Sequence, residues 1–411
     1  MKLLYIGRQF SGLRTSLVSG RWQPTGVPTI YRMIEAFAAR TDQFHLLLVD
    51  KDRRQDDAVC ETRLAGLDCP VTLLGLPAWV RRIGSSAIGE IWQTVAVLRQ
   101  ARRQAPDIIY IDHANTLAAG ILARFSHRRV VYRIMGVYPF MRDVMHGTGV
   151  RNRLFRWAYR QPYDLAICTQ DGSGVEPWLS AALDPAVPVQ VMVNGVDKSI
   201  AEAALPDEVE DFRATLPSGS TLVLFLGKVE PAKGVAEFVE GMARAIQQGD
   251  GRIHGLIVGT GSLDAAIDAR LAELGLTDRI RRVRALPHRS VLAVFRQADI
   301  YVSMNRLGNL SNANLEAIVS GCCMIIPDSQ PQSGIDIFTD ALLPQHAVLR
   351  FGPVEEVGAL GEALAALCAD PQRREGMRAA TKAASAALPS WDERIGHEFD
   401  LVTALLDGAA R

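Results

Sequence analysis

Short apolar runs that alternate with longer amphipathic stretches are the feature that most constrains the fold of this chain. In the first half, the runs typical of buried strands are Met1–Gly7, Phe44–Asp50, Val71–Leu76, Asp107–Asp112, Val130–Ile134, Asp164–Thr169 and Val189–Val193. Amphipathic stretches such as Thr29–Arg40 and Ile88–Gln104 lie between them. Buried runs separated by helices indicate βαβ units and a parallel sheet.

The alternation restarts in the second half, after a stretch rich in Pro and Ala and a turn at 194–197. The strands predicted there are Thr221–Gly227, Ile253–Gly259, Ile280–Ala285, Ile300–Met304 and Cys323–Pro327. A chain of 411 residues is also too long for one ordinary core. We therefore predict an α/β fold with two doubly wound, Rossmann-like domains facing one cleft, residues 1–198 and 199–388. A C-terminal segment, 389–411, follows, with a helix from Trp391 to Leu406.

Composition narrows the expected partners and compartment. Lys and Arg together number 45, as do Asp and Glu, so the formal net charge is zero and nucleic acid is not an expected partner. The six cysteines form no CxxC pair and indicate free thiols in a reducing compartment. Because we find neither a signal peptide nor an apolar run of roughly 20 residues, we expect a cytoplasmic protein.

Lys228 and Lys233 flank a turn that begins at Gly227, directly after a predicted strand, and leads into a helical stretch. Two ammonium groups beside a helix N-terminus suit a diphosphate, whose charge they would hold and whose departure they would stabilise. The alternative is a pair of solvated surface lysines.

Two further turns follow strands of the second half. Gly259 and Gly261 lie in a turn with small residues, which lets a ligand approach the backbone. A nicotinamide site would need GxGxxG and a partner carboxylate, so the dehydrogenase interpretation is weak. Leu286 and His288 follow the next strand; a lone His is more often structural than functional.

A polar loop leads from the strand ending at Met304 into a helix. Ser311 or Asn312 is its expected N-cap, so its first amides could bind a phosphate or a sugar. Glu316 lies on the opening turns, where its carboxylate could take both ribose hydroxyls. The alternative is a capped helix with an exposed Glu favoured by the helix dipole.

The N-terminal half offers two candidates. The loop at Thr25, Gly26 and Val27 precedes a helix starting near Pro28 and could close over acceptor or donor phosphates, although a plain turn with Pro at the first helical position explains it equally well. Asp112 and His113 end a predicted strand, where a carboxylate and an imidazole could contact an acceptor hydroxyl, and a structural His is the alternative.

These motifs occur in an order that resembles the retaining, GT-B-fold glycosyltransferases of family 4. The resemblance is strong from about Val193 onward, and weaker before it. The motifs that carry it are Asn194-Gly195-Val196-Asp197, Gly227-Lys228, Lys233-Gly234, Gly259-Thr260-Gly261, Leu286-Pro287-His288, Leu315-Glu316-Ala317 with Gly321, and the final Trp391-Asp392-Glu393. The last of these is similar to the helix with which the family returns to its N-terminal domain.

The resemblance implies roles for particular residues. Lys228 and Lys233 match the basic pair that neutralises the donor diphosphate, with Lys in place of the usual Arg at the first position. Glu316 matches the ribose ligand, whereas Gly308 occupies the position of the Glu that contacts the transferred sugar. The residues that we expect to bind the donor are Gly227, Gly259, Gly261, Leu286, His288, Asn309, Ser311, Asn312, Ala313 and Glu316. Of these, Asn309, Ser311 or Asn312 would replace the missing carboxylate.

The N-terminal half departs further from the family. Thr25, Gly26 and Val27 match its glycine loop, which touches phosphates or the acceptor. The family's active-site His would lie near Arg133–Gly136, where no His occurs, and His113 is the candidate substitute. With Lys228 and Lys233 it completes the candidate catalytic set.

The resemblance thus implies a retaining transferase that needs no metal or other cofactor and moves a sugar from a nucleotide-diphosphate sugar to a glycan, lipid-linked or small-molecule acceptor, in bacterial polysaccharide or glycoconjugate synthesis. Residues 138–160 are basic and rich in aromatics, which suits peripheral contact with the inner face of the cell membrane; a solvated helix with its aromatics in the core is the alternative. A nucleotide-sugar-binding protein without transfer activity and a sugar-nucleotide epimerase are the rival functions.

Overall fold

The computed structural model describes residues 1–52, 58–198, 204–249 and 251–407. The chain divides into two compact units. Unit 1 contains Met1–Thr169, Glu176–Gly195 and Asp392–Arg411, and unit 2 contains Gln170–Val175 and Val196–Trp391. This division falls within a few residues of the predicted boundaries, with one difference. The segment 170–175, expected in the N-terminal domain, packs with unit 2.

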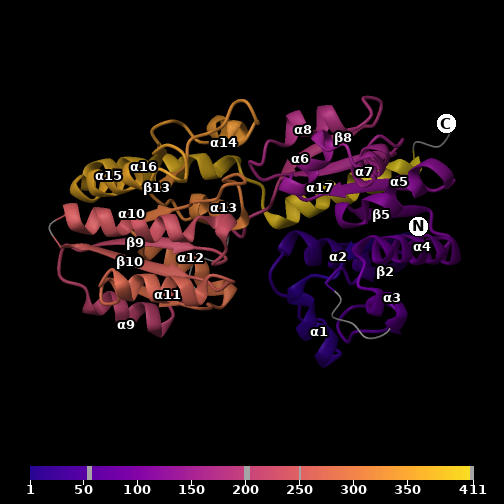
Figure 1. Ribbon diagram of the computed structural model, residues 1–411, viewed down its shortest axis with the longest axis horizontal. Helices are drawn as coiled ribbons and strands as arrows, with labels where there is room; N and C mark the ends of the chain where they lie inside the picture. The colour runs from indigo at the N-terminus through magenta and orange to yellow at the C-terminus, as the bar shows by residue number, and fades with distance from the viewer. Residues whose placement is uncertain (53–57, 199–203, 250, 408–411) are drawn as a thin grey trace. The chain divides into compact units, whose positions relative to one another are not determined.

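Unit 1 is built on an eight-stranded sheet of order β3-β4-β2-β1-β5-β6-β7-β8 (Figure 1). Its strands are β1 (Lys2–Arg8), β2 (Gln43–Val49), β3 (Cys60–Thr62), β4 (Val71–Leu74), β5 (Ile108–Asp112), β6 (Arg129–Ile134), β7 (Leu165–Gln170) and β8 (Val189–Val193). All seven strands predicted for this half are present. The addition is β3, a short edge strand that pairs antiparallel with β4 and carries no buried apolar run that could have revealed it.

Helices flank this sheet and begin where the sequence favours a start. They are α1 (Arg14–Ser19), α2 (Pro28–Arg40), α3 (Ala78–Ile83), α4 (Ser86–Gln104), α5 (Thr116–Phe125), α6 (Pro139–His146), α7 (Val150–Tyr159), α8 (Val175–Ala182) and α17 (Trp391–Asp407), with the 3-10 turns η1 (Ser11–Leu13) and η2 (His113–Asn115). Pro28 occupies the first position of α2, and the hydroxyl of Ser85 caps α4 by accepting from the amide of Ile88.

The C-terminal helix α17 completes unit 1, and Figure 1 shows it in yellow among the indigo and magenta elements. Its buried Glu398 accepts from the Tyr110 hydroxyl of β5, and its Oε1 lies 2.9 Å from Nε of Arg133 on β6. Arg394 pairs with Glu398 and donates to the Val193 carbonyl at the end of β8. Burial alone would raise the pKa of Glu398, but the two arginines outweigh it and hold that pKa below its usual value.

Unit 2 is built on a six-stranded parallel sheet of order β11-β10-β9-β12-β13-β14. Its strands are β9 (Thr221–Leu226), β10 (Ile253–Val258), β11 (Ile280–Val283), β12 (Ile300–Val302), β13 (Met324–Ile326) and β14 (Val348–Arg350). The five predicted strands are confirmed. The short β14 was not predicted, because its three residues are only partly buried.

The helices of unit 2 cover this sheet. They are α9 (Asp207–Thr215), α10 (Val235–Gln248), α11 (Asp264–Glu273), α12 (His288–Gln297), α13 (Asn312–Val319), α14 (Ile337–Leu342), α15 (Val357–Ala369) and α16 (Pro371–Ala384), with the 3-10 turns η3 (Pro231–Lys233) and η4 (Ser385–Ala387). Strongly amphipathic α10 buries Phe238 and Met242 in a core that includes Phe225 of β9.

Two further expectations concern the whole chain. All six cysteines are unpaired, as predicted. Among the described helices, none combines the length and the apolar character that crossing a bilayer requires.

Candidate functional site

The strand order of unit 2 reverses between β9 and β12, because the chain runs outward from β9 to β11 and then returns to β12 before continuing to β14. In open α/β sheets, ligands bind outside the carboxyl ends of the strands at this switch point. A small cavity of about 40 Å³ lies there. Candidates from both flanking loops line it, among them Gly227, Lys233, Ser311 and Ala313.

The two candidate lysines differ in their surroundings. Lys228 is exposed, whereas Lys233 is half-buried at the end of η3 and lines the cavity. Burial lowers the pKa of Lys233, and the carboxylate of Asp171 opposes that shift. Gly234 follows with φ 66°, and a Cβ there would lie 2.5 Å from Cβ of Met304. Glycine at 234 therefore lets η3 pack against the end of β12, which sets the position of Lys233.

The glycine turn after β10 is packed backbone to backbone against the turn after β9. A Cβ on Gly259 would lie 1.9 Å from the carbonyl oxygen of Gly227, and one on Gly261 would lie 2.2 Å from that of Val229. The Val229 amide donates to the carbonyl of Thr260 across the same junction, at 3.1 Å. Gly259 and Gly261 are thus needed for close backbone packing, and this packing holds the two predicted donor-binding turns together.

Two residues predicted separately from the sequence meet at the next strand end. Nε2 of His288, the first residue of α12, lies 3.6 Å from Oε1 of Glu316 on α13. The Glu316 side chain is only 16% exposed, so the alternative of an exposed Glu on a capped helix is wrong. Burial, followed by the nearby charge of Asp197, raises the pKa of Glu316 to about 8. Leu286, half-buried, precedes α12 in the same loop.

The polar loop between β12 and α13 is held by a buried hydrogen-bond network. Asn309, 1% exposed, accepts from the Ser303 hydroxyl at 2.8 Å and donates through its side-chain amide to Asp336. Asn314 donates to Ser303 at 3.0 Å and accepts from the Tyr301 hydroxyl at 2.9 Å. The interpretation of Asn309 as a direct sugar ligand is therefore corrected, because its side chain is committed to holding this loop.

The start of α13 remains accessible to a ligand. Ser311 is the N-cap by position, yet its hydroxyl bonds the side chain of Asn314, 3.1 Å away, and no backbone amide. Ser311, Asn312 and Ala313 are each half-buried, and Ser311 and Ala313 line the cavity with Lys233. Amides at a helix start that lack a side-chain cap are suited to phosphate oxygens.

Gly308, which stands where the family has a Glu, is fixed by a contact that the sequence did not reveal. Its φ is 121°, and a Cβ there would lie 2.3 Å from the carbonyl carbon of Gly172. Asp336 braces the same junction: its carboxylate accepts from the Asn309 amide at 2.6 Å and from the Thr339 hydroxyl at 2.8 Å. The missing Glu is thus explained by packing, since no side chain fits between 308 and 172.

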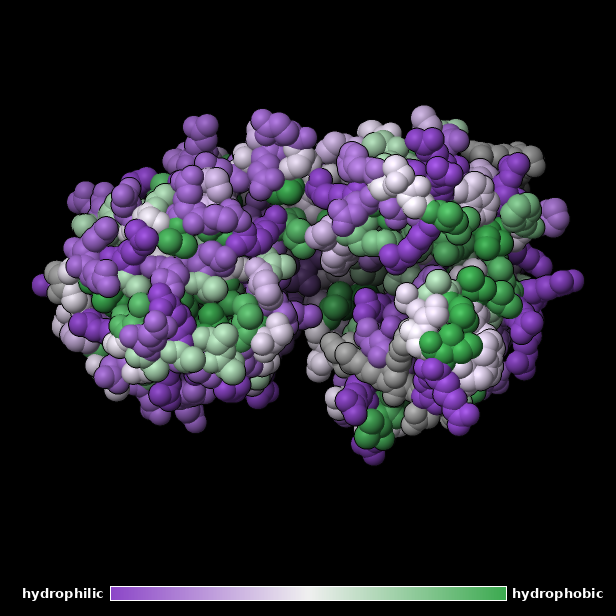
Figure 2. All heavy atoms as spheres, viewed as in Figure 1, coloured by the Kyte–Doolittle hydropathy of each residue, from purple (hydrophilic) through white to green (hydrophobic). Residues whose placement is uncertain are grey.

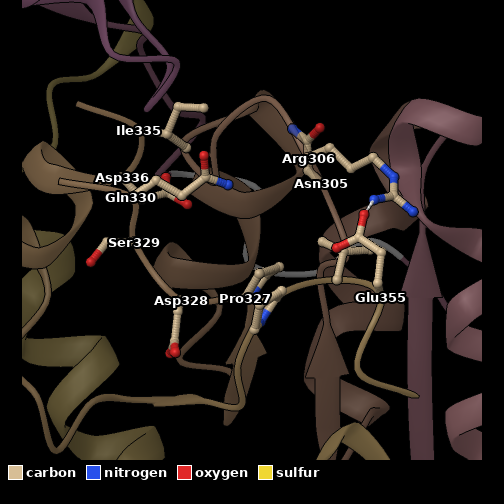
Figure 3. A pocket seen from close by; sticks show the side chains of 11 residues that line it. Asn305, Arg306, Pro327, Asp328, Ser329, Gln330, Ile335, Asp336 and Glu355 are labelled. Atoms are coloured by element: carbon tan, nitrogen blue, oxygen red, sulfur yellow. Dashed lines mark hydrogen bonds and ion pairs between the residues drawn. The ribbon is translucent and has the colours of Figure 1, made fainter. Parts of the chain in front are cut away.

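A larger cavity of about 460 Å³ lies beside the small one and shares Asn305 with it. The loops after β12, β13 and β14 form it. Figure 3 shows the ion pair of Arg306 with Glu355 on one side and Gln330 beside Asp336 on the other. Arg306 also pairs with Glu237 of α10. This polar hollow adjoins the predicted sugar side of the site.

The candidates in unit 1 occupy the carboxyl edge of its sheet. His113 follows β5, stacks on the ring of Tyr138 with centroids 5.4 Å apart, and has a pKa lowered by burial. Near the position expected for the family's His, Arg133 is fully buried and paired with Glu398, so it faces no ligand. Thr25, Gly26 and Val27 form an exposed loop before α2, with Gly26 at φ 91°.

Sequence reasoning overlooked Asp171 and Asp336. Asp171 follows β7, so the rule that chemistry lies at strand carboxyl ends could have found it. Asp336 lies in a segment with no motif and carried no such signal. Within the described ranges, no group of three or more His, Cys, Asp or Glu side chains lies together so as to hold a metal ion.

Comparison with known proteins agrees with this geometry. The family described as "Glycosyl transferases group 1" matches residues 220–370, and the "Glycosyl transferase 4-like domain" matches residues 25–168, so that together they span most of the chain. A 2-deoxystreptamine glucosyltransferase of Streptomyces kanamyceticus is 32% identical over 237 residues, which is 57% of this chain and 56% of that protein.

Solved structures show the same fold over the whole chain. Sucrose-phosphate synthase of Thermosynechococcus elongatus superposes with a TM-score of 0.72 at 17% identity, covering 100% of both chains. Anabaena HepE in complex with UDP gives 0.65 at 14% identity, covering 98% of this chain and 100% of that one. The chain therefore belongs to the group 1 glycosyl transferases and has the GT-B fold.

Proposed function

We propose that this protein transfers a sugar from a nucleoside-diphosphate sugar to an acceptor hydroxyl, with the donor bound by unit 2. The observation that supports this most directly is the arrangement at the β9/β12 switch point, where half-buried Lys233 and the start of α13 line one cavity. A cation and helix amides converging on one point suit a diphosphate. Family membership adds the reaction class.

The proposed chemistry is metal-independent and retains the anomeric configuration. Lys228 and Lys233 would stabilise the charge that develops on the leaving diphosphate, without any metal or other cofactor. The departing phosphate would help to take the proton of the acceptor hydroxyl as the new glycosidic bond forms on the same face. In this scheme His113, with its lowered pKa, is a neutral imidazole that can accept a hydrogen bond from the acceptor.

The ribose contact is assigned to Glu316. With a pKa near 8 this side chain is largely protonated at neutral pH, and a carboxylic acid both donates and accepts, as do the two ribose hydroxyls. Gly259, Gly261, Leu286 and His288 would line the nucleoside beside it. UDP and glucose are the first candidates for nucleotide and sugar, because HepE has been solved with both and the curated relative is a glucosyltransferase.

The test of the donor site is Lys233→Ala. We expect loss of transfer and of UDP binding with an unchanged circular dichroism spectrum, while Lys2→Ala, which removes one positive charge from β1 of unit 1, retains both. A thermal-shift screen with UDP-, GDP-, ADP- and CMP-sugars names the donor class by the nucleotide that stabilises the protein. Full turnover by Lys233→Ala would contradict the assignment.

The same experiments separate the rival functions. A protein that binds nucleotide sugars without using them would be stabilised in the screen yet show neither transfer nor donor hydrolysis. An epimerase would convert the donor sugar itself, with no acceptor present. The family match favours transfer over both.

We further propose that the acceptor is a glycan or a lipid-linked molecule, and that the reaction serves bacterial polysaccharide or glycoconjugate synthesis on the cytoplasmic side of the membrane. In α7, Val150, Leu154 and Trp157 are exposed among arginines, while Phe155 and Tyr159 are buried. Other exposed apolar side chains of unit 1 gather over α3 and α4 (Figure 2).

This pattern favours contact with anionic lipid. Flotation with anionic vesicles should weaken in a Leu154→Ser, Trp157→Ser double variant, but not in Phe338→Ser, which changes an exposed ring of unit 2. Equal flotation of both variants, or none by the wild type, would contradict it.

A further inference from the structure

The segment 170–175 lies between β7 and α8, yet it is fastened to the candidate donor site of unit 2. The carbonyl of Asp171 accepts from the amide of Leu310 at 3.0 Å, and the carbonyl of Gly172 accepts from the amide of Asp336 at 2.8 Å. Ser173 forms an antiparallel bridge with Ile335. Six residues therefore hold two loops of the site at once.

The 3-10 turn that ends at Lys233 is fastened to the same loop from its other side. The amide of Arg306 donates to the carbonyl of Ala232 at 3.2 Å, and Gly234 packs tightly on Met304. The loop 305–310 is thus a common support for η3 and for the segment 170–175. Asp171 and Lys233 therefore lie on the two segments that this loop joins, and the charge of each acts on the pKa of the other.

The Asp171 carboxylate is itself held in place. Its Oδ1 accepts from the amide of Ser173 at 3.0 Å and from the Ser173 hydroxyl. Burial raises the pKa of Asp171 to about 6, while Ser173 and then Lys233 act to lower it. At neutral pH the group is therefore mainly ionised, and Lys228 is the other charge acting on Lys233.

We propose that Asp171 is a positioning residue, which acts through Lys233 by keeping that side chain charged for the donor diphosphate. The identity of the ligand, a donor diphosphate, rests on the proposed function, whereas the coupling between Asp171 and Lys233 does not. Without Asp171, half-buried Lys233 loses the charge that opposes its desolvation, so it becomes neutral at a lower pH. A neutral amine binds a diphosphate less well, and the defect should therefore grow as the pH rises.

The pair can be tested without any ligand. The chain has six lysines, so NMR of lysine labelled with ¹³C at Cε gives few signals, and Lys233→Arg assigns the relevant one. We expect the pKa of Lys233 to fall in Asp171→Asn, to recover in part in Asp171→Glu, and to stay unchanged in Asp211→Asn, which removes the same charge from an exposed position on α9. Identical titration of Lys233 in the wild type and in Asp171→Asn would overturn the proposal.

Calorimetric titration with UDP between pH 6 and pH 9 supplies the functional readout. A loss of affinity in Asp171→Asn that increases with pH supports positioning, whereas an equal loss at every pH indicates loop damage and overturns it. Ser173→Ala keeps the carboxylate but removes its support, and it should give a smaller loss of the same pH dependence. If the wild type fails to bind UDP while Lys233 still responds to Asp171→Asn, the pair stands and the assigned donor is wrong.

Discussion

Gly308 provides the sharpest test of how the loop between β12 and α13 is built. Gly308→Ala adds one methyl group at φ 121°, 2.3 Å from the carbonyl carbon of Gly172. Forcing a non-glycine residue into left-handed backbone costs about 1–2 kcal/mol, and overpacking adds about 1–3 kcal/mol. We therefore expect the free energy of unfolding to drop by about 2–5 kcal/mol, which is a Tm lower by roughly 4–20 °C for a unit of this size.

Urea unfolding followed by circular dichroism measures the loss, and hydrogen exchange of peptides covering 305–316 locates it. The matched control is Gly376→Ala on α16, where a new Cβ meets nothing within 4 Å. In an exposed helix the same substitution stabilises by about 0.5–1 kcal/mol. Opposite signs for the two variants are expected, and a Gly308→Ala protein as stable as the wild type would refute the reasoning. Gly308→Glu, which restores the family's residue, should be less stable still and gain no transfer activity.

Three further predictions follow from buried groups. Glu398→Gln leaves Arg133 and Arg394 without their counter-charge and should destabilise unit 1 by about 3–5 kcal/mol in urea unfolding. Because the pKa of Glu398 is lower in the folded than in the unfolded protein, its stabilisation is present above the unfolded pKa and is lost as the pH falls through the folded pKa. A stability difference between wild type and variant that does not change with pH would contradict the assignment. Glu316→Gln should raise the Tm of the ligand-free protein and weaken UDP binding. Because the folded protein raises the pKa of Glu316, the wild type loses stability from about pH 4.5 toward pH 8, and the Tm difference between variant and wild type should widen over that range. A Tm difference that stays constant with pH would count against this prediction. Asn309→Ala removes the side-chain hydrogen bond to the buried Asp336 carboxylate and the oxygen that accepts from the Ser303 hydroxyl, and it should cost about 2–4 kcal/mol, with faster hydrogen exchange in loop 305–311; exchange like that of the wild type would exclude the bracing role of this side chain.

The sequence predicted what is local and periodic. Buried apolar runs located twelve strands, and Pro28 marked the start of α2, because these signals depend on neighbours along the chain. It also named Lys233, Glu316 and His288 as candidates, since they follow strands at the edge where parallel sheets bind ligands.

The sequence could not reveal contacts between segments that are far apart along the chain. Gly308 looked like the loss of a ligand, whereas it matches Gly172, a residue 136 positions earlier that a single sequence cannot pair with it. From the sequence, Asn309 is available to bind a sugar, but in the structure its side chain donates to Asp336, which lies in a loop without any motif. The raised pKa of Glu316 depends on burial, which a helix N-terminal pattern does not disclose.

The way unit 1 is assembled has a consequence for its synthesis. Tyr110 and Glu398 are 288 residues apart, so the ribosome makes the partner of β5 and β6 last. At about 5–20 residues per second, Tyr110 waits roughly 15–60 s for Glu398. During that interval Arg133 lacks the carboxylate of Glu398, while the ribosome makes the main segment of unit 2, Val196–Trp391. Unit 2 should therefore be able to reach its native state before unit 1, whose sheet stays incomplete until α17 has been made.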